Sequence, residues 1–142
     1  MPLQSTRGSV AIANEEIGRW KVLIVEDDPE LWPILERFSE AADPGVEIEF
    51  AGNASEAEER LTSGTRYNAI VTDYCLPRPG AGKAILDRAT SLQPWARVGM
   101  VSALMGFEPE KGTPFLAKPF TRQTYLRFLR NLLLWPRSAQ TR

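Results

Sequence analysis

Short apolar runs alternate along this chain with segments in which apolar residues recur every three or four positions. The first run, residues 22–25 (VLIV), is apolar throughout and rich in β-branched side chains. Such a run is typical of a strand that is covered on both faces in a parallel sheet. Pro29 follows and suits the first turn of a helix, whose apolar positions continue at helical spacing through Phe38.

The same alternation continues through the rest of the chain. We expect further strands near residues 46–50, 67–73, 96–101 and 114–118, and further helices that begin after Asn53 or Ser55, run through 85–92, and begin at Thr121. The segment 103–113 contains two glycines and a proline, so at most a short helix fits there. The pattern predicts an α/β fold with a doubly wound, five-stranded parallel sheet in the flavodoxin-like order 2-1-3-4-5, with the fourth helix shortened or absent.

Polar residues stand where four of these strands end. Glu26 and Asp27 follow the first strand, Asp73 ends the third, Ser102 follows the fourth, and Lys118 follows the fifth. In the expected strand order these side chains converge on one crevice at the carboxyl edge of the sheet. Clustered carboxylates stay ionised together only when a cation or a hydrogen-bonding partner offsets their repulsion. Oxygen ligands favour Mg²⁺ over Zn²⁺, so we expect magnesium there.

Length and composition limit the other possibilities. The 142 residues suffice for one domain with a full core, and we expect a flexible leader at 1–18, a folded domain at 19–136 and a tail at 137–142. Lys and Arg number 17 against 18 Asp and Glu, so no overall field recruits nucleic acid or an acidic membrane. The single cysteine and the lack of a long apolar run indicate a cytoplasmic protein. With no histidine, Ser-His or Cys-His nucleophile pairs and phosphohistidine in this chain are excluded.

Over roughly residues 20–135, the chain resembles the receiver domain of bacterial two-component response regulators. The resemblance rests on Glu26 and Asp27 in IVEDD, Asp73 in IVTDYCLP, Ser102 in MVSA and Lys118 in LAKPF. Each short motif alone is weak, but their order, their places at strand ends and the Leu-Pro pair after Asp73 make the combination specific. Because little sequence follows the expected final helix, the resemblance is to receivers of the stand-alone, single-domain type.

This resemblance implies a phosphoacceptor and not an enzyme that turns over a substrate. Asp73 would accept a phosphoryl group from a sensor histidine kinase or a histidine phosphotransfer protein, and the acyl phosphate would hydrolyse slowly. Mg²⁺ would be held by Glu26, Asp27, Asp73 and the backbone carbonyl of Cys75, and the phosphoryl group would be contacted by Ser102 and Lys118. The signal would then pass on by phosphotransfer or protein docking. The alternative is an adaptor of the same fold that works without phosphorylation.

Simpler explanations exist for single residues, and the chain departs from the receiver pattern in places. The acids after the first strand could be solvated or cap a helix, Ser102 could be a loop hydroxyl, and Cys75 could be a small packed residue.

The interval from Ser102 to Lys118 is shorter than is usual in receivers. The aromatic residue three positions before Lys118 is Phe115, which has no hydroxyl.

The final helix is unusually apolar. Its apolar residues are more than a single stripe facing the sheet requires: Tyr125, Leu126, Phe128, Leu129, Leu132, Leu133, Leu134 and Trp135. They predict either a homodimer contact through this helix, with Phe128 and Trp135 near its centre, or packing against neighbouring segments of the same chain.

Overall fold

A computed structural model describes residues 20–103 and 112–134 of the chain. Its elements, in chain order, are β1 (Lys21–Val25), the short 3₁₀ helix η1 (Pro29–Leu31), α2 (Trp32–Ala42), β2 (Glu47–Ala51), α3 (Ala54–Leu61), β3 (Ala69–Asp73), α4 (Ala81–Leu92), β4 (Arg97–Ser102), β5 (Phe115–Ala117) and α5 (Arg122–Leu134). The five strands form one parallel sheet in the order β2-β1-β3-β4-β5. The predicted fold class and strand order are therefore confirmed.

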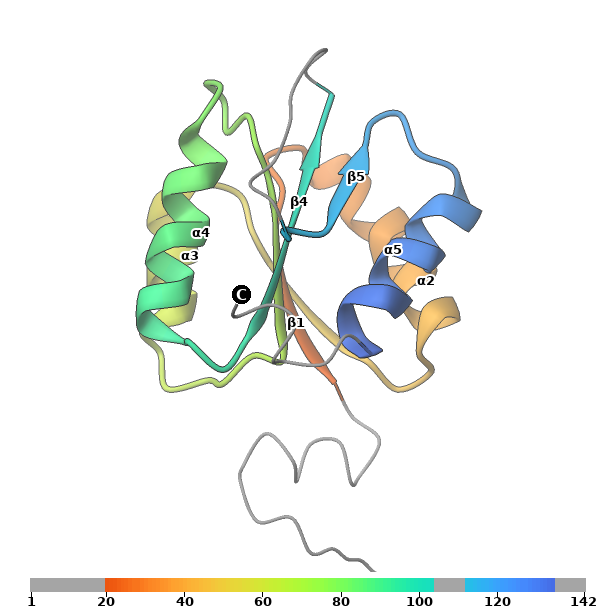
Figure 1. Ribbon diagram of the computed structural model, residues 1–142, viewed down its shortest axis with the longest axis horizontal. Helices are drawn as coiled ribbons and strands as arrows, with labels where there is room; N and C mark the ends of the chain where they lie inside the picture. The colour runs from red at the N-terminus through yellow and green to blue at the C-terminus, as the bar shows by residue number, and fades with distance from the viewer. Residues whose placement is uncertain (1–19, 104–111, 135–142) are drawn as a thin grey trace, which may run out of the picture.

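The helices cover both faces of this sheet. Figure 1 shows α3 and α4 on one face and α2 and α5 on the other. One apolar cluster lies under α2 and α5 and takes Val22 and Ile24 from β1; the second lies under α3 and α4 and takes Leu23 and Val25. Successive residues of β1 thus point into opposite cores, which explains why the run at 22–25 is apolar without alternation.

Local hydrogen bonds explain where several elements begin. The Asn53 side chain accepts the Glu56 amide at 2.8 Å, so Asn53 is the cap of α3. Thr121 caps α5 in the same way, since its hydroxyl accepts the Thr124 amide at 3.1 Å. The third strand begins at Ala69, two residues later than expected, because the Tyr67 amide donates to the Gln93 side chain and not to a strand.

The expectation for the fourth helix falls largely on residues 104–111, which lie outside the described part. No helix lies between β4 and β5 among the residues described there, 103 and 112–114. The expected leader, and the tail at 137–142, also lie outside the described residues. In the described chain, no helix has the length and apolar character needed to cross a membrane.

One of the two predictions for the final helix placed Phe128 on its outer, exposed face, and this placement is wrong. This side chain is only 6% exposed, and a Cβ built on Gly99 would lie 2.9 Å from its ring. The ring therefore packs directly on β4, where the glycine leaves room for it. Leu132 and Leu133 are also buried, and Leu134 is the large hydrophobic side chain that stands exposed among those described. Trp135 lies outside the described residues.

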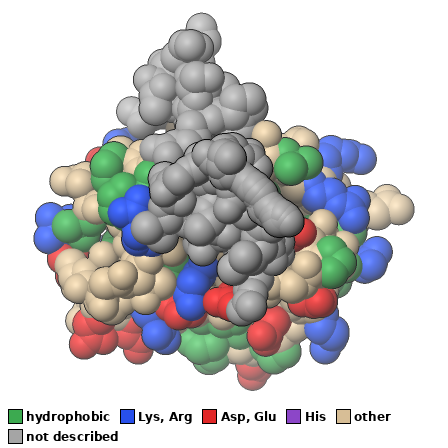
Figure 2. All heavy atoms as spheres, turned by 90° about the horizontal axis from the view of Figure 1, so that it is seen from below, with side chains coloured by type: hydrophobic (Ala, Val, Ile, Leu, Met, Phe, Trp, Pro, Cys, Tyr) green, Lys and Arg blue, Asp and Glu red, His purple; other side chains and the backbone are tan. Residues whose placement is uncertain are grey.

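The end of the molecule opposite the carboxyl edge of the sheet carries charges of both signs. Figure 2 looks onto this end, and its uncovered part shows acidic and basic side chains mixed around the rim. Mixed charge of this kind agrees with the formal net charge of -1. The visible surface has no basic stripe of the sort that tracks a phosphate backbone.

Candidate phosphoacceptor site

Three carboxylates meet at the carboxyl edge of the sheet. Glu26 and Asp27 follow β1, and Asp73 is the last residue of β3, the strand that pairs with β1. Each of the three offers an oxygen atom, and these atoms lie within 4.8 Å of one another. Glu26 and Asp73 are buried, whereas Asp27 is exposed. A group of hard oxygen donors with one open side fits a divalent cation that keeps part of its water shell.

Lys118 crosses the sheet edge to reach the two buried acids. Its ammonium Nζ lies 2.6 Å from Asp73 Oδ2 and 3.0 Å from Glu26 Oε1. The lysine follows β5, and its amide donates to the Ser102 carbonyl at 2.8 Å, which fixes its backbone beside β4. The side chain must therefore extend from the end of β5 towards β3 and β1. The Lys118 ammonium thus offsets the repulsion expected between the clustered carboxylates.

Burial and pairing act in opposite directions on the charges of this cluster. Burial raises the pKa of Glu26 above its ordinary value of 4.5, and the bonds from Lys118 oppose that rise. Burial alone would lower the pKa of Lys118, but its bonds to Asp73 and Glu26 outweigh burial and raise it above 10.5. Lys118 is therefore an ammonium at neutral pH and places a positive charge beside the two buried carboxylates.

The other two predicted residues also lie at this edge. Ser102 ends β4 and is 2% exposed, so it is not a solvated loop hydroxyl. Cys75 is half-buried, and its amide lies 3.4 Å from Asp73 Oδ1. The structure thus places Glu26, Asp27, Asp73, Ser102 and Lys118 at the strand ends where the sequence predicts them, and Cys75 two residues after the end of β3; the roles of these residues stay predictions. Phe115 lies on β5, half-buried against the core under α3 and α4.

Two residues that hold this site in place were missed in the sequence. Trp32, the first residue of α2, donates its indole N–H to the Glu26 carbonyl at 3.0 Å and thereby holds the backbone of that acid. Gly82, near the start of α4, donates its amide to the Tyr74 carbonyl at 2.9 Å. A Cβ at Gly82 would lie 1.8 Å from the Asp73 carbonyl oxygen, so only glycine fits there.

The signals for these two residues were weak. A tryptophan beside a proline at the start of a helix resembles any core aromatic. In the sequence, the glycines at positions 80 and 82 lie close to two prolines and indicate only a loop, and only the contact with the Asp73 backbone explains why position 82 lacks a side chain.

Comparisons with known proteins show that this fold is similar to that of receiver domains. No protein-family model matches the sequence, and no curated protein matches it. Among solved structures, the chemotaxis response regulator CheY4 of Vibrio cholerae is 25% identical, with a TM-score of 0.66, over 81% of this chain and 99% of that one. The receiver domain of the hybrid histidine kinase CckA is 25% identical, with a TM-score of 0.65, over 80% and 98%.

A third similar structure was solved in a modified state. It is a response regulator protein from Burkholderia pseudomallei with a phosphorylated aspartic acid, a calcium ion and citrate. It is 21% identical to this chain, with a TM-score of 0.63, over 84% of this chain and 69% of that one. The sheet order, the carboxylate cluster and these likenesses lead to one conclusion: the chain has the fold of a CheY-like response regulator receiver domain.

Proposed function

We propose that this protein accepts a phosphoryl group on Asp73 from the phosphohistidine of a sensor histidine kinase or a histidine phosphotransfer protein. The observation that carries the proposal is the 2.6 Å contact between Lys118 Nζ and Asp73 Oδ2 inside a cluster of three carboxylates. A buried aspartate, an ammonium and a cation site in one place supply a nucleophile and the positive charge that phosphoryl transfer requires.

The transfer itself is a displacement at phosphorus. An Asp73 carboxylate oxygen forms the new oxygen–phosphorus bond while the phosphorus–nitrogen bond to the donor histidine breaks. The imidazole keeps the electron pair of the broken bond and takes up a proton. Lys118 and Ser102 would pair with the phosphoryl oxygens as charge develops on them, which lowers the barrier by electrostatic stabilisation.

We further propose Mg²⁺ as the cation. Glu26, Asp27 and Asp73 would hold it through side-chain oxygens, and Cys75 through its backbone carbonyl. When bound, the ion supplies charge neutralisation for the phosphoryl oxygens. The all-oxygen donor set supports this choice, since it suits a hard cation better than Zn²⁺. Because only the carbonyl of Cys75 is involved, Cys75→Ala should bind Mg²⁺ with an affinity within about threefold of the parent.

Acetyl phosphate labelling tests the phosphoacceptor directly. With Mg²⁺ present, the parent protein should shift completely on a phosphate-affinity gel and gain one phosphoryl mass, whereas Asp73→Asn should not. Asp87→Asn is the matched control, since it makes the same chemical change on the exposed face of α4. Labelling of Asp73→Asn, or labelling unaffected by a chelator, would contradict the proposal.

The second candidate is an adaptor of the same fold that signals without phosphorylation. Its support is that Phe115 lacks a hydroxyl and that the interval from Ser102 to Lys118 is short for a receiver; both departures concern signal output and not the acceptor residue. A parent protein that takes no label from acetyl phosphate or from a histidine kinase would favour this candidate. The further expectations of a phosphorelay role, a cytoplasmic location and a homodimer stay predictions, and the buried Phe128 weakens the last of them.

A further inference from the structure

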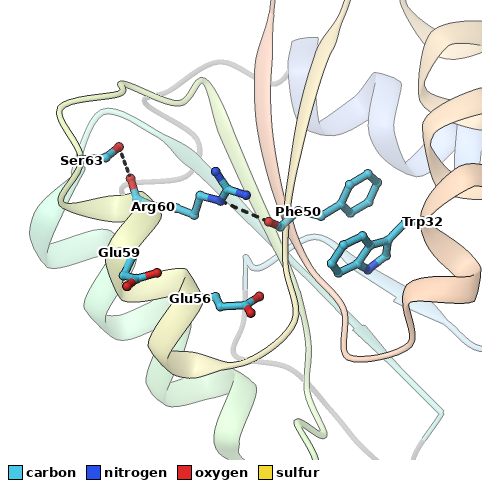
Figure 3. Close-up of a pocket in the computed structure, with 6 residues that line it drawn as sticks. All are labelled: Trp32, Phe50, Glu56, Glu59, Arg60 and Ser63. Carbon is cyan, nitrogen blue, oxygen red and sulfur yellow. Dashed lines mark hydrogen bonds between the residues drawn. The ribbon is translucent and has the colours of Figure 1, made fainter.

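A pocket of about 550 Å³ lies at the open edge of the sheet, beside β2. Its lining residues come from the start of α2, from β2 and from α3: Trp32, Phe50, Glu56, Glu59, Arg60 and Ser63 (Figure 3). Figure 3 shows the two aromatic rings on one side and the α3 side chains on the other. The proposed phosphoacceptor chemistry does not use this pocket.

The aromatic side of the pocket is rigid. The rings of Trp32 and Phe50 stack with centroids 4.9 Å apart and planes 6° from parallel. The indole N–H is bonded to the Glu26 carbonyl, so the tryptophan is held at both its face and its edge. A partner group that contacts these rings would pay little entropy for ordering them.

The opposite side of the pocket carries unbalanced negative charge. Its single cation, Arg60, is already engaged: its Nε donates to the Phe50 carbonyl at 3.2 Å, and its guanidinium lies 3.8 Å from Glu49. Glu56 accepts only the Gly52 amide, at 2.7 Å, and no ion pair to Glu56 or Glu59 occurs within the described residues. Both carboxylates are exposed and available to an incoming cation.

These two sides together select one kind of side chain. We propose that the pocket binds an arginine side chain of a partner protein. A guanidinium is planar, is attracted to the face of an aromatic ring, and donates two parallel hydrogen bonds to a carboxylate. An apolar side chain would leave the carboxylates unpaired, and an acidic one would be repelled by them.

The edge strand favours contact through side chains over contact through the backbone. A peptide that added a strand beside β2 would need the outward carbonyl of Phe50, and Arg60 already occupies that acceptor. A partner would therefore approach with its side chain directed into the pocket. An occupant touching Trp32 also touches the residue that holds the Glu26 backbone, which links this pocket to the carboxylate cluster.

The test uses short peptides and the indole signal of Trp32. A blocked Gly-Gly-Arg-Gly-Gly peptide is titrated into ¹⁵N-labelled protein, with Trp32→Phe identifying the indole resonance. The matched peptide carries citrulline, which has the same shape as arginine but no charge. We expect saturable shifts of the Trp32 signal with a Kd of about 1 mM for the arginine peptide, and at least about tenfold weaker binding of the citrulline peptide.

Protein variants test whether the carboxylates of this pocket bind the arginine peptide. Glu56→Gln and Glu59→Gln, both at exposed positions, should each weaken the arginine peptide by about threefold or more, and Asp87→Asn on α4 should leave its affinity unchanged. Equal binding of the arginine and citrulline peptides, or of a leucine peptide, would overturn the assignment of arginine. So would the absence of any saturable Trp32 shift at about 10 mM peptide. None of these measurements depends on phosphorylation, so they stand apart from the labelling of Asp73.

Discussion

A methyl group added at Gly82 should disturb both the stability of the protein and the position of Asp73. The Cβ of Gly82→Ala would lie 1.8 Å from the Asp73 carbonyl oxygen, 2.7 Å from its carbonyl carbon and 2.8 Å from the Tyr74 Cα. All three neighbours are backbone atoms, so no side chain can rotate away. The start of α4 must move by about 1.5 Å to reach an ordinary carbon–oxygen separation.

The magnitude follows from three effects. Overpacking against an inflexible neighbour costs about 1–3 kcal/mol. Moving the helix start also weakens the hydrogen bond from the Gly82 amide to the Tyr74 carbonyl, which is worth about 1 kcal/mol. Alanine recovers up to about 1 kcal/mol through its better helix propensity. We expect the free energy of unfolding to fall by about 1–3 kcal/mol.

Urea unfolding followed by circular dichroism measures this loss, and the rate of acetyl phosphate labelling measures the displacement of Asp73. The control is Ala84→Gly, an exposed change in the same helix that should cost about 1 kcal/mol or less and leave labelling unchanged. A Gly82→Ala protein as stable as the parent, with the same labelling rate, would refute the inferred contact between α4 and the Asp73 backbone.

Three further predictions concern other parts of the molecule. Mg²⁺ at about ten times its Kd should raise the unfolding free energy by roughly 1.4 kcal/mol, and Asp27→Asn, which removes one of the proposed ligands, should abolish that gain in a thermal melt. Burial would raise the pKa of Glu49, but hydrogen bonds from the Tyr67 hydroxyl and from Lys21 outweigh burial and lower this pKa below 4.5. Its contribution to stability should therefore be present above pH 4.5 and disappear as the pH falls through the lower folded-state pKa, and Glu49→Gln should flatten this part of a stability–pH profile. Ser39→Ala should lower the free energy of unfolding by about 1–3 kcal/mol in urea, because it leaves the buried Tyr125 hydroxyl without its partner. Tyr125→Phe should cost less, because Ser39 keeps its bond to the Leu35 carbonyl. Equal losses in the two variants would contradict this.

The sequence determined the architecture because hydrophobic patterning is local. The run at 22–25 specified a strand covered on both faces, and the acids, the serine and the lysine that follow the strands were placed by the rule that parallel strands present their carboxyl ends at one edge. A helix start at Asn53 or Ser55 and another at Thr121 could be predicted because a cap depends on bonds within one turn, and the structure shows Asn53 as the first of these caps.

Only the tertiary structure decided how those parts meet. The 2.6 Å contact of Lys118 with Asp73 joins residues 45 positions apart, and no local pattern sets such a distance. The apolar excess on the final helix was compatible with an exposed contact surface or with packing inside the same chain, and for Phe128 the structure shows packing, because Gly99 on β4 leaves room for its ring. Trp32 and Gly82 gained their roles from close approach to the backbones of Glu26 and Asp73, which depends on how a helix sits against a sheet and not on the residues beside it in the chain.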